Sequence, residues 1–296
     1  MMKHKPTKHL ALRIACAILA ALLVLTGAEL LYSNFALTVS RYSVQSEKVT
    51  GAFRVVFLTD LHGREFGKDN RRLLKRIAAE EPDLIALAGD IFNYDADDDE
   101  IHRTCRFIQG AAKIAPVYFS LGNHEQAFAG NLRTDLLEPV RESGATVLIC
   151  EFADVEIRGT PVRIGGNTSY YRQPGMTIGD AELRRRELVF ADAFEATDRF
   201  KLLLDHIPTT WLDWAYIDDY PVDLVLSGHY HGGLIRIPFL DQGLAAPYVG
   251  WLPPYTKGIF TGGRATCVLT TGLAGSRLPR FFNPPEIAVV DISGYR

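Results

Sequence analysis

Short apolar runs alternate with amphipathic stretches through the first half of the chain, and this alternation constrains the fold more than any other feature. Three apolar runs have strand length: RVVFLT from Arg54, LIALAG from Leu84 and VYFSLG from Val117. The stretches between them, 68–80 and 100–112, are long enough for helices. Buried parallel strands read as continuous apolar runs, and helices cover the faces of their sheet. The pattern therefore predicts βαβ units in an α/β fold.

The second half of the chain begins with a hairpin pattern, which is followed by one predicted helix and further strands. The segment VEIRGTPVRIGG, residues 155–166, predicts a hairpin that turns near Gly159. A helix is expected at about 180–193. Further strands are predicted at 201–205, 223–227, 267–270 and 287–292.

The amino terminus carries an apolar run of nearly membrane length. Residues 14–28 have no charge, and the apolar character extends over 10–32 apart from Arg13 and Glu29. A spanning helix needs about 20 apolar residues, and these two charged side chains are able to extend toward the headgroups. We therefore expect a single-pass membrane anchor.

The charges around this run predict its orientation. Four basic residues precede it and two follow it closely: Lys3, Lys5, Lys8 and Arg13 before, Arg41 and Lys48 after. The positive-inside rule keeps the amino terminus in the cytoplasm and places the domain outside it. Two alternatives stay open, a cleaved signal peptide and a buried helix of a soluble domain, since small residues at 26–28 resemble a cleavage region.

Composition excludes several classes of protein. The chain has 296 residues, of which 47% are hydrophobic and 23% charged, as expected for a globular domain with a short appendage. The net charge of −3 gives no broad attraction for nucleic-acid phosphates. The four cysteines are too scattered for a zinc knuckle or a disulfide framework. The acidic run DADDDE at 95–100 is typical of a solvated loop and helix start.

Polar side chains follow five of the predicted strands at their carboxyl ends. They are Asp60 and His62, Asp90 and Asn93, Asn123 with His124 and Glu125, His206, and finally His229 and His231. Any one of them alone would be an ordinary structural residue. Loops at the carboxyl ends of parallel strands line a single crevice, so we expect the five segments to converge. Oxygen and imidazole donors without thiolate suit Mn, Fe, Zn or Ni.

These motifs resemble the calcineurin-like metallophosphoesterase superfamily, and within it the membrane-associated bacterial branch. The resemblance rests on DLH, GDIFN, GNHE, LLLDH and GHYHGG, in this order, and covers the chain from about Arg54 onward. It implies an α/β fold, a four-layer α/β/β/α sandwich of two mixed sheets, here with an amino-terminal transmembrane helix. We divide the chain into an anchor at 1–32, a linker and first strand at 33–52, and a catalytic domain at 53–296.

The resemblance also implies roles for individual residues. One metal ion would be held by Asp60, His62 and His231, Asp90 would bridge, and the second would be held by Asn123, His206 and His229. His124 would be the catalytic histidine that is not a ligand. Many members have Asp in the next position, where this chain has Glu125, which we expect to orient His124. Arg64 is either a phosphate contact or a solvated cation.

The predicted activity is hydrolysis of a phosphomonoester, phosphodiester or pyrophosphate by two divalent transition-metal ions. The membrane location favours a lipid or cell-envelope substrate. Two alternatives remain: a nuclease, which the negative charge disfavours, and a catalytically silent metal-binding scaffold at the membrane. The segment 239–260, rich in Pro, Gly and aromatic residues, either walls the substrate crevice or serves packing.

Overall fold

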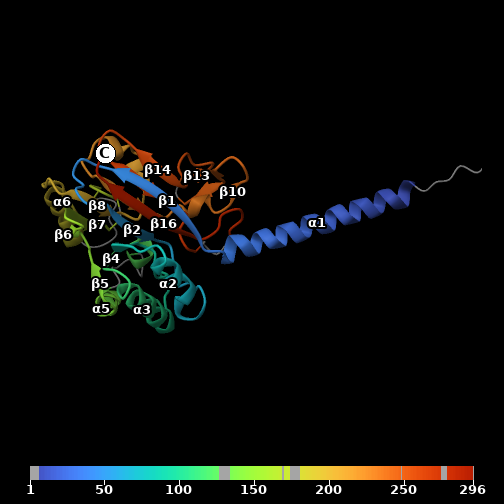
Figure 1. The fold of residues 1–296 in the computed structure, drawn as a ribbon, viewed down its shortest axis with the longest axis horizontal. Coiled ribbons are helices and arrows are strands. Elements are labelled where there is room, and N and C mark those ends of the chain that lie inside the picture. The colour runs from blue at the N-terminus through green and yellow to red at the C-terminus, as the bar shows by residue number, and fades with distance from the viewer. Residues whose placement is uncertain are drawn as a thin grey trace, which may run out of the picture.

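Two six-stranded mixed sheets stack face to face and carry helices on their outer faces (Figure 1). The computed structural model describes residues 7–126, 134–168, 170–173, 181–247, 249–274 and 279–295. The arrangement confirms the predicted α/β sandwich with two mixed sheets. The long helix α1 projects away from the sandwich (Figure 1).

The first sheet contains the strands that begin the catalytic region. Its order is β1 (Thr38–Gln45), β16 (Glu286–Ser293), β2 (Phe53–Leu58), β3 (Leu84–Ala88), β4 (Val117–Ser120) and β5 (Ala145–Val147). All neighbours are parallel except β16 and β2. The helices of this half are η1 (Lys68–Asn70), α2 (Arg71–Ala78), α3 (Asp98–Ala112), α4 (Asn123–Gln126) and α5 (Thr134–Glu142). Figure 1 shows α2, α3 and α5 on the outer side of this sheet.

The second sheet contains the hairpin and the later strands. Its order is β14 (Gly258–Thr261), β15 (Thr266–Leu269), β9 (Leu224–Ser227), β8 (Phe200–Leu204), β7 (Thr160–Gly166) and β6 (Glu151–Ile157). The pairs at the two edges are antiparallel and the inner pairs are parallel. The helices of this half are α6 (Ala181–Glu195), α7 (Thr209–Leu212), η3 (Tyr216–Asp218) and η4 (His231–Gly233).

Apolar side chains from both sheets form the central core. Val55 and Phe57 of β2 point into it, as do Leu202 and Leu204 of β8, and all four are fully buried. Alternate residues of a strand face opposite sides, so the neighbouring Val56, Leu58 and Leu203 pack on the helical side. Burial on both faces explains why these strands lack the polar alternation of a surface strand.

The acidic run at 95–100 begins α3, as predicted. The Asp97 side chain caps the helix by accepting a hydrogen bond of 2.8 Å from the Glu100 N–H. Asp98 and Asp99 lie in the first turn, where the helix dipole favours negative charge.

Two small hairpins follow η4 and form a separate lobe. They pair β10 (Arg236–Ile237) with β11 (Gln242–Gly243) and β12 (Ala245–Ala246) with β13 (Gly250–Trp251). Figure 1 shows this lobe beside the end of α1 that meets the sandwich. The apolar runs of the sequence do not predict these hairpins, since each strand has only two residues.

The helix α1 spans Thr7–Phe35, and the chain enters β1 within three residues of its end. Residues 9–35 form a segment long and apolar enough to cross a membrane, and the sandwich buries none of its most apolar part. β1 pairs along its whole length with β16. The chain therefore passes from the helix into the first sheet almost directly.

Candidate metal centre

The loops after β2, β3, β4, β8 and β9 converge at one end of the two sheets, as the sequence predicted. Potential ligand atoms form three overlapping clusters. Within each cluster, the ligand atoms of its three residues all lie within 4.8 Å of one another. The clusters are Asp60 with His62 and His231, His62 with Asp90 and His124, and Asp90 with His206 and His229. The clusters bring together six of the seven expected ligands and the expected catalytic histidine, His124.

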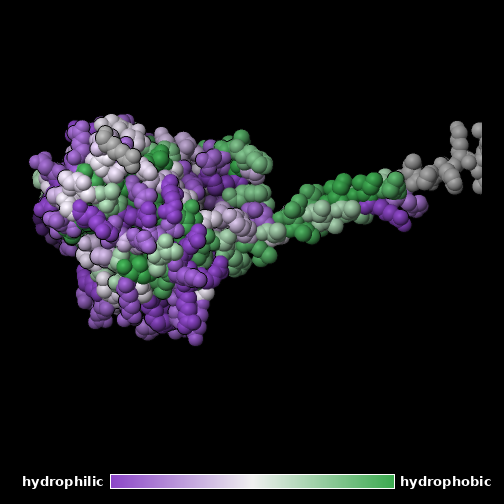
Figure 2. All heavy atoms as spheres, viewed as in Figure 1, coloured by the Kyte–Doolittle hydropathy of each residue, from purple (hydrophilic) through white to green (hydrophobic). Residues whose placement is uncertain are grey.

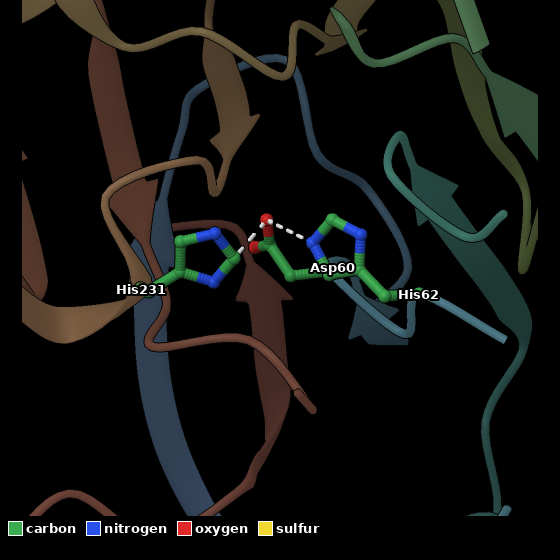
Figure 3. Close-up of side chains that lie close together, drawn as sticks. All are labelled: Asp60, His62 and His231. Atoms are coloured by element: carbon green, nitrogen blue, oxygen red, sulfur yellow. Dashed lines mark ion pairs between the residues drawn. The ribbon is translucent and has the colours of Figure 1, made fainter. Parts of the chain in front are cut away.

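Asp60 lies between the imidazoles of His62 and His231 (Figure 3). Its Oδ1 is 3.9 Å from His62 Nε2 and 3.8 Å from His231 Nδ1. The Asp60 side chain also accepts the His229 N–H at 3.2 Å. One carboxylate therefore holds together two loops that are far apart in the sequence.

Asp90 occupies the middle of the centre. Its Oδ2 is 3.2 Å from His206 Nε2, 3.8 Å from His62 Nε2 and 3.9 Å from His124 Nε2. Its Oδ1 accepts the His124 N–H at 2.8 Å. A carboxylate facing histidines of both proposed sites suits a bridging ligand.

Several buried donor and acceptor atoms in the centre have no hydrogen-bond partner. They include Asn123 Oδ1, His62 Nε2 and His206 Nε2. Buried polar atoms are normally paired, because leaving one unpaired costs about 1–3 kcal/mol. Unpaired oxygen and imidazole nitrogen atoms that surround two carboxylates fit divalent transition-metal ions.

Backbone carbonyl groups orient two of the histidines. His206 Nδ1 lies 2.9 Å from the Ala88 carbonyl oxygen, and His231 Nδ1 lies 3.2 Å from that of Ala274. A backbone carbonyl accepts a hydrogen bond from Nδ1–H, so Nε2 is the ring nitrogen available to a metal ion. This arrangement fixes the ring and is the usual support of a metal-binding histidine.

Five of the proposed ligands have left-handed backbone conformations. Their φ values are 53° for Asp60, 48° for His62, 52° for Asp90, 69° for His229 and 46° for His231. Such values are uncommon outside glycine and cluster at functional sites. An extended backbone at this point would direct the side chains of His229 and His231 to the same side. They instead join different clusters, through left-handed turns.

Glycines allow the carboxylates to approach the neighbouring loops. A Cβ atom at Gly228 would lie 2.4 Å from Asp60 Oδ2, and one at Gly122 would lie 2.2 Å from Asp90 Oδ1. Both positions therefore exclude every other residue unless a carboxylate moves. Glycine, which has no Cβ, permits this close approach of backbone to the carboxylates.

Burial controls the protonation of the histidines. It lowers the pKa of both His62 and His231 to about 4, so both rings are neutral at pH 7. Burial acts in the same direction on His206, but attraction to Asp90 and Asp60 outweighs it and raises the pKa to about 10. A cation held by the two carboxylates would compete with that proton.

Glu125 supports the loop that carries Asp90. We expected Glu125 to orient His124, but its carboxylate accepts its hydrogen bonds from the backbone of two loops and none from the His124 side chain. Its Oε2 accepts the N–H groups of Asp90 at 2.9 Å and Gly122 at 2.7 Å. Its Oε1 accepts those of Ile91 at 2.7 Å and Phe92 at 3.0 Å. The glutamate is long enough to reach both loops, and it is fully buried between them.

His124 is the accessible member of the centre. Its side chain is 26% exposed, whereas that of His206 is fully buried. The Tyr94 N–H points to His124 Nδ1 at 3.3 Å. A ring that accepts at Nδ1 carries its proton on Nε2, the atom that faces Asp90.

Arg64 does not join the ligand clusters. It donates to the carbonyl oxygen of Asn34 at the end of α1, and its guanidinium lies over the rings of Phe35 and Phe66. Neither of the two expected roles, a phosphate contact or a solvated cation, describes these contacts.

Two supporting groups were not predicted from the sequence. Asp205, next to His206, accepts from Trp211 Nε1 at 2.6 Å and from Asn167 Nδ2 at 3.1 Å. The fully buried Arg280 donates to the carbonyl oxygens of Gly272 and Ala274. These contacts form only once the chain is folded. Arg280 belongs to no quoted motif, and the LLLDH motif that contains Asp205 does not record the partners of its side chain.

Comparison with known proteins agrees with this geometry. The sequence profile of the calcineurin-like phosphoesterase family matches residues 53–233. The chain belongs to this family. It is therefore a metal-dependent phosphoric ester hydrolase, of a family that uses a dinuclear metal centre.

Three curated proteins are similar in sequence to this calcineurin-like phosphoesterase. A Bacillus subtilis protein named uncharacterized metallophosphoesterase YkuE is 28% identical over 80% of this chain and 78% of its own length. The Escherichia coli phosphodiesterase YaeI is 26% identical over 81% and 82%. The UDP-2,3-diacylglucosamine pyrophosphatase LpxG of Chlamydia muridarum is 25% identical over 80% and 82%.

Proposed function

We propose that this calcineurin-like phosphoesterase hydrolyses a phosphodiester or pyrophosphate bond in a lipid or cell-envelope substrate outside the cytoplasm. The observation that carries the proposal is the convergence of two carboxylates, an amide and four histidines at the carboxyl ends of five strands, beside the accessible His124. The names of YaeI and LpxG, a phosphodiesterase and a pyrophosphatase of an acylated substrate, support the two bond types.

The ligand assignment is part of the proposal. One ion would be held by Asp60, His62 and His231, the other by Asn123, His206 and His229, and Asp90 would bridge them. Bound divalent ions would neutralise the phosphate ester and make a water molecule acidic enough to attack it. The donor set suits Mn, Fe, Zn or Ni.

His124 would deliver a proton to the leaving oxygen. Two contacts position it to do so, because Asp90 accepts its backbone N–H, and the Tyr94 N–H points to Nδ1 and favours a proton on Nε2. Its partial exposure opens Nε2 to a substrate that comes from solvent. Asp90 would thus position both the ions and the acid.

The apolar helix α1 supports a membrane location. It is a single span by length and composition, and the basic residues before it favour a cytoplasmic amino terminus. The catalytic domain would then face outward.

Replacement of the bridging carboxylate tests the binuclear assignment. Asp90→Asn keeps the shape but removes the charge, so we expect loss of both ions and of turnover on phosphodiester and pyrophosphate substrates. Elemental analysis of the purified protein measures occupancy, and Asp98→Asn on the surface of α3 serves as the control. A fully active wild-type protein with one ion or none would contradict the proposal.

A further inference from the structure

The lobe of small hairpins exposes an unusual concentration of apolar side chains. Phe239 and Leu240 lie on a turn of the lobe, Trp251 and Leu252 lie at the end of β13, and Phe282 lines the same pocket as Phe239; we call these five residues the apolar apex. Phe239 is fully exposed and Trp251 is 77% exposed. Contiguous apolar patches on a soluble surface mark sites of interaction.

The apex lies beside the end of α1. The Phe282 N–H donates to Glu29 Oε1 at 2.9 Å, and the Asn283 N–H donates to Ser33 Oγ at 3.0 Å. One residue further along α1, Asn34 Nδ2 donates to the Arg280 carbonyl oxygen at 3.0 Å, and Asn34 Oδ1 accepts the Arg280 N–H at 3.1 Å. The last turns of α1 are thus bound to the segment that carries Phe282.

The lobe is bound to that same segment. Ile235 forms a bridge with Phe281, and Asn283 Nδ2 donates to the Leu234 carbonyl oxygen at 3.0 Å. Phe239 and Phe282 line one pocket together with Arg236. Both α1 and the lobe therefore contact one short segment, residues 280–283. These contacts fix the position of the apex relative to α1.

The interior of the lobe is polar and well bonded, which makes the exposed tips a distinct surface feature. The buried Arg236 donates to the Gly232 carbonyl oxygen and to Thr256 Oγ1, both at 3.1 Å, and to the Asp241 carbonyl oxygen at 2.7 Å. Phe239 and Leu252 have φ values of 69° and 51°, as at tight turns. The tips project outward from a fixed base.

The bilayer itself is the occupant that best fits this surface. Residues 10–28 of α1, apolar apart from Arg13 near their start, are roughly 28 Å long at about 1.5 Å per residue, close to the thickness of a hydrocarbon core of about 30 Å. Glu29, which follows them, binds the apex segment, so the apex lies at the level where the span ends. Figure 2 shows hydrophobic atoms on α1 and also on the lobe beside the end of this helix.

Residue types support the same conclusion. Trp is enriched at the boundary between headgroups and acyl chains, and Phe and Leu anchor proteins that lie in this boundary. A basic side chain that suits lipid phosphates also lies at this end. Arg72 is exposed and donates to the Phe35 carbonyl oxygen at 3.2 Å.

We propose that the apolar apex inserts into the outer boundary of the bilayer that α1 spans. The domain would then be held at two points, and the metal centre would face lipid head groups at a fixed height, because His231 and η4 lead directly into the lobe. The proposal rests on the membrane span of α1 and is independent of the ester that the protein hydrolyses.

Quenching of Trp251 by lipid tests the insertion. The full chain is placed in nanodiscs of phosphatidylcholine brominated on the acyl chains, and its fluorescence is compared with that in unbrominated nanodiscs. If the apex inserts by about 5–10 Å, bromine should reduce the fluorescence emission of Trp251 by roughly half or more. Trp251→Phe should remove this bromine-dependent loss, since Trp211 is buried in the core and Trp214, which is 40% exposed, is not part of the apex.

A matched pair of variants separates the apex from general surface effects. Leu240→Glu places a charge in the apex and should reduce the bromine-dependent loss at least twofold. Val189→Glu changes an equally apolar, exposed residue on α6, which lies at the far side of the domain from α1 (Figure 1), and should leave the loss unchanged.

Three results would overturn the proposal. Equal bromine quenching of wild type and Trp251→Phe would mean that the apex faces water. Protection of Trp251 from aqueous acrylamide without bromine quenching would assign the apex to a protein partner. Failure of the full chain to copurify with nanodiscs would refute the span of α1, and the apex proposal with it, whatever phosphoesters the protein hydrolyses.

Discussion

Glu125 connects the two loops that present Asp90 and Asn123. Each carboxylate oxygen accepts two backbone N–H groups, and no solvent reaches the side chain to replace them. The residue thereby shapes the centre without offering an atom to a metal ion. Its importance comes from the amides that it pairs.

Glu125→Gln should weaken metal binding while leaving every ligand in place. The amide nitrogen of glutamine donates, so two of the four N–H groups lose their acceptor, which costs about 1–3 kcal/mol. We expect metal affinity to fall about 10–100-fold, as for other supports of metal ligands. Chelator competition measures the affinity, and the exposed Glu142→Gln is the control. Unchanged metal affinity would show that the two loops keep their conformation without the Glu125 carboxylate.

His124→Ala should affect substrates according to their leaving groups. General acid catalysis matters most when negative charge would otherwise accumulate on the departing oxygen, so an alkyl phosphodiester should slow by about 10²–10⁴ and a nitrophenyl ester much less. Metal content should stay at the wild-type level, as it should in the exposed control His102→Ala. Equal losses on both substrates would assign His124 to electrostatic support of the phosphoryl oxygens. Loss of metal would make it a ligand.

At the scale of elements, β16 joins the two sheets near the centre through Glu286. This carboxylate accepts from Tyr42 Oη of β1 at 3.0 Å. It also accepts from the Thr270 hydroxyl and the Thr271 N–H, both at 2.9 Å, in the segment that follows β15. One side chain thus pairs groups from both layers.

Glu286→Gln should destabilise the fold by about 1.5–3 kcal/mol at pH 7, because hydrogen bonds to a charged group are lost. Burial raises the pKa of Glu286, but Lys257 and the hydrogen bonds outweigh burial and lower it below the ordinary value of 4.5. A lowered folded-state pKa adds stability above 4.5 that is lost as the pH falls through the folded value. Denaturation at several pH values should therefore show the difference from wild type shrinking in acid. The exposed Glu156→Gln should show no such difference.

The sequence predicted the elements whose burial is complete. β2, β3, β4, β8 and β9 each match an apolar run, since full burial removes polar residues from both faces of a strand. The edge strand β14 was missed because its burial alternates, and β5 because it has only three residues. The two-residue strands of the lobe depend on contacts with distant segments, which no local pattern records.

The convergence of the candidate ligands was predictable for a related reason. A parallel strand fixes where its carboxyl end lies, so a polar residue just after it is placed by the fold. The sequence did not reveal the left-handed conformations of Asp60 and Asp90 or the amide contacts of Glu125. Those features depend on how two loops pack against each other. The spacing of residues within each loop does not encode that packing.

At the scale of the whole molecule, the proposed orientation predicts where a protease can act. Added to intact spheroplasts, it should degrade the chain beyond α1, because the basic residues before α1 keep only the amino terminus inside. A cytoplasmic marker protein should stay intact in the same sample. Full protection of the membrane-inserted protein, lost on addition of detergent, would place the domain in the cytoplasm.

The pairing of β1 with β16 has a consequence for biogenesis. α1 and β1 are synthesised well before the rest of the domain, yet β1 finds its only strand neighbour in the described sheet at residues 286–293. The first sheet therefore cannot close while the ribosome is still making those residues, and β2 keeps an open edge until then. In the proposed topology the domain would cross the membrane as an unfolded chain behind α1. A chain interrupted before β16 would reach the far side with exposed strand edges and be a substrate for chaperones and proteases.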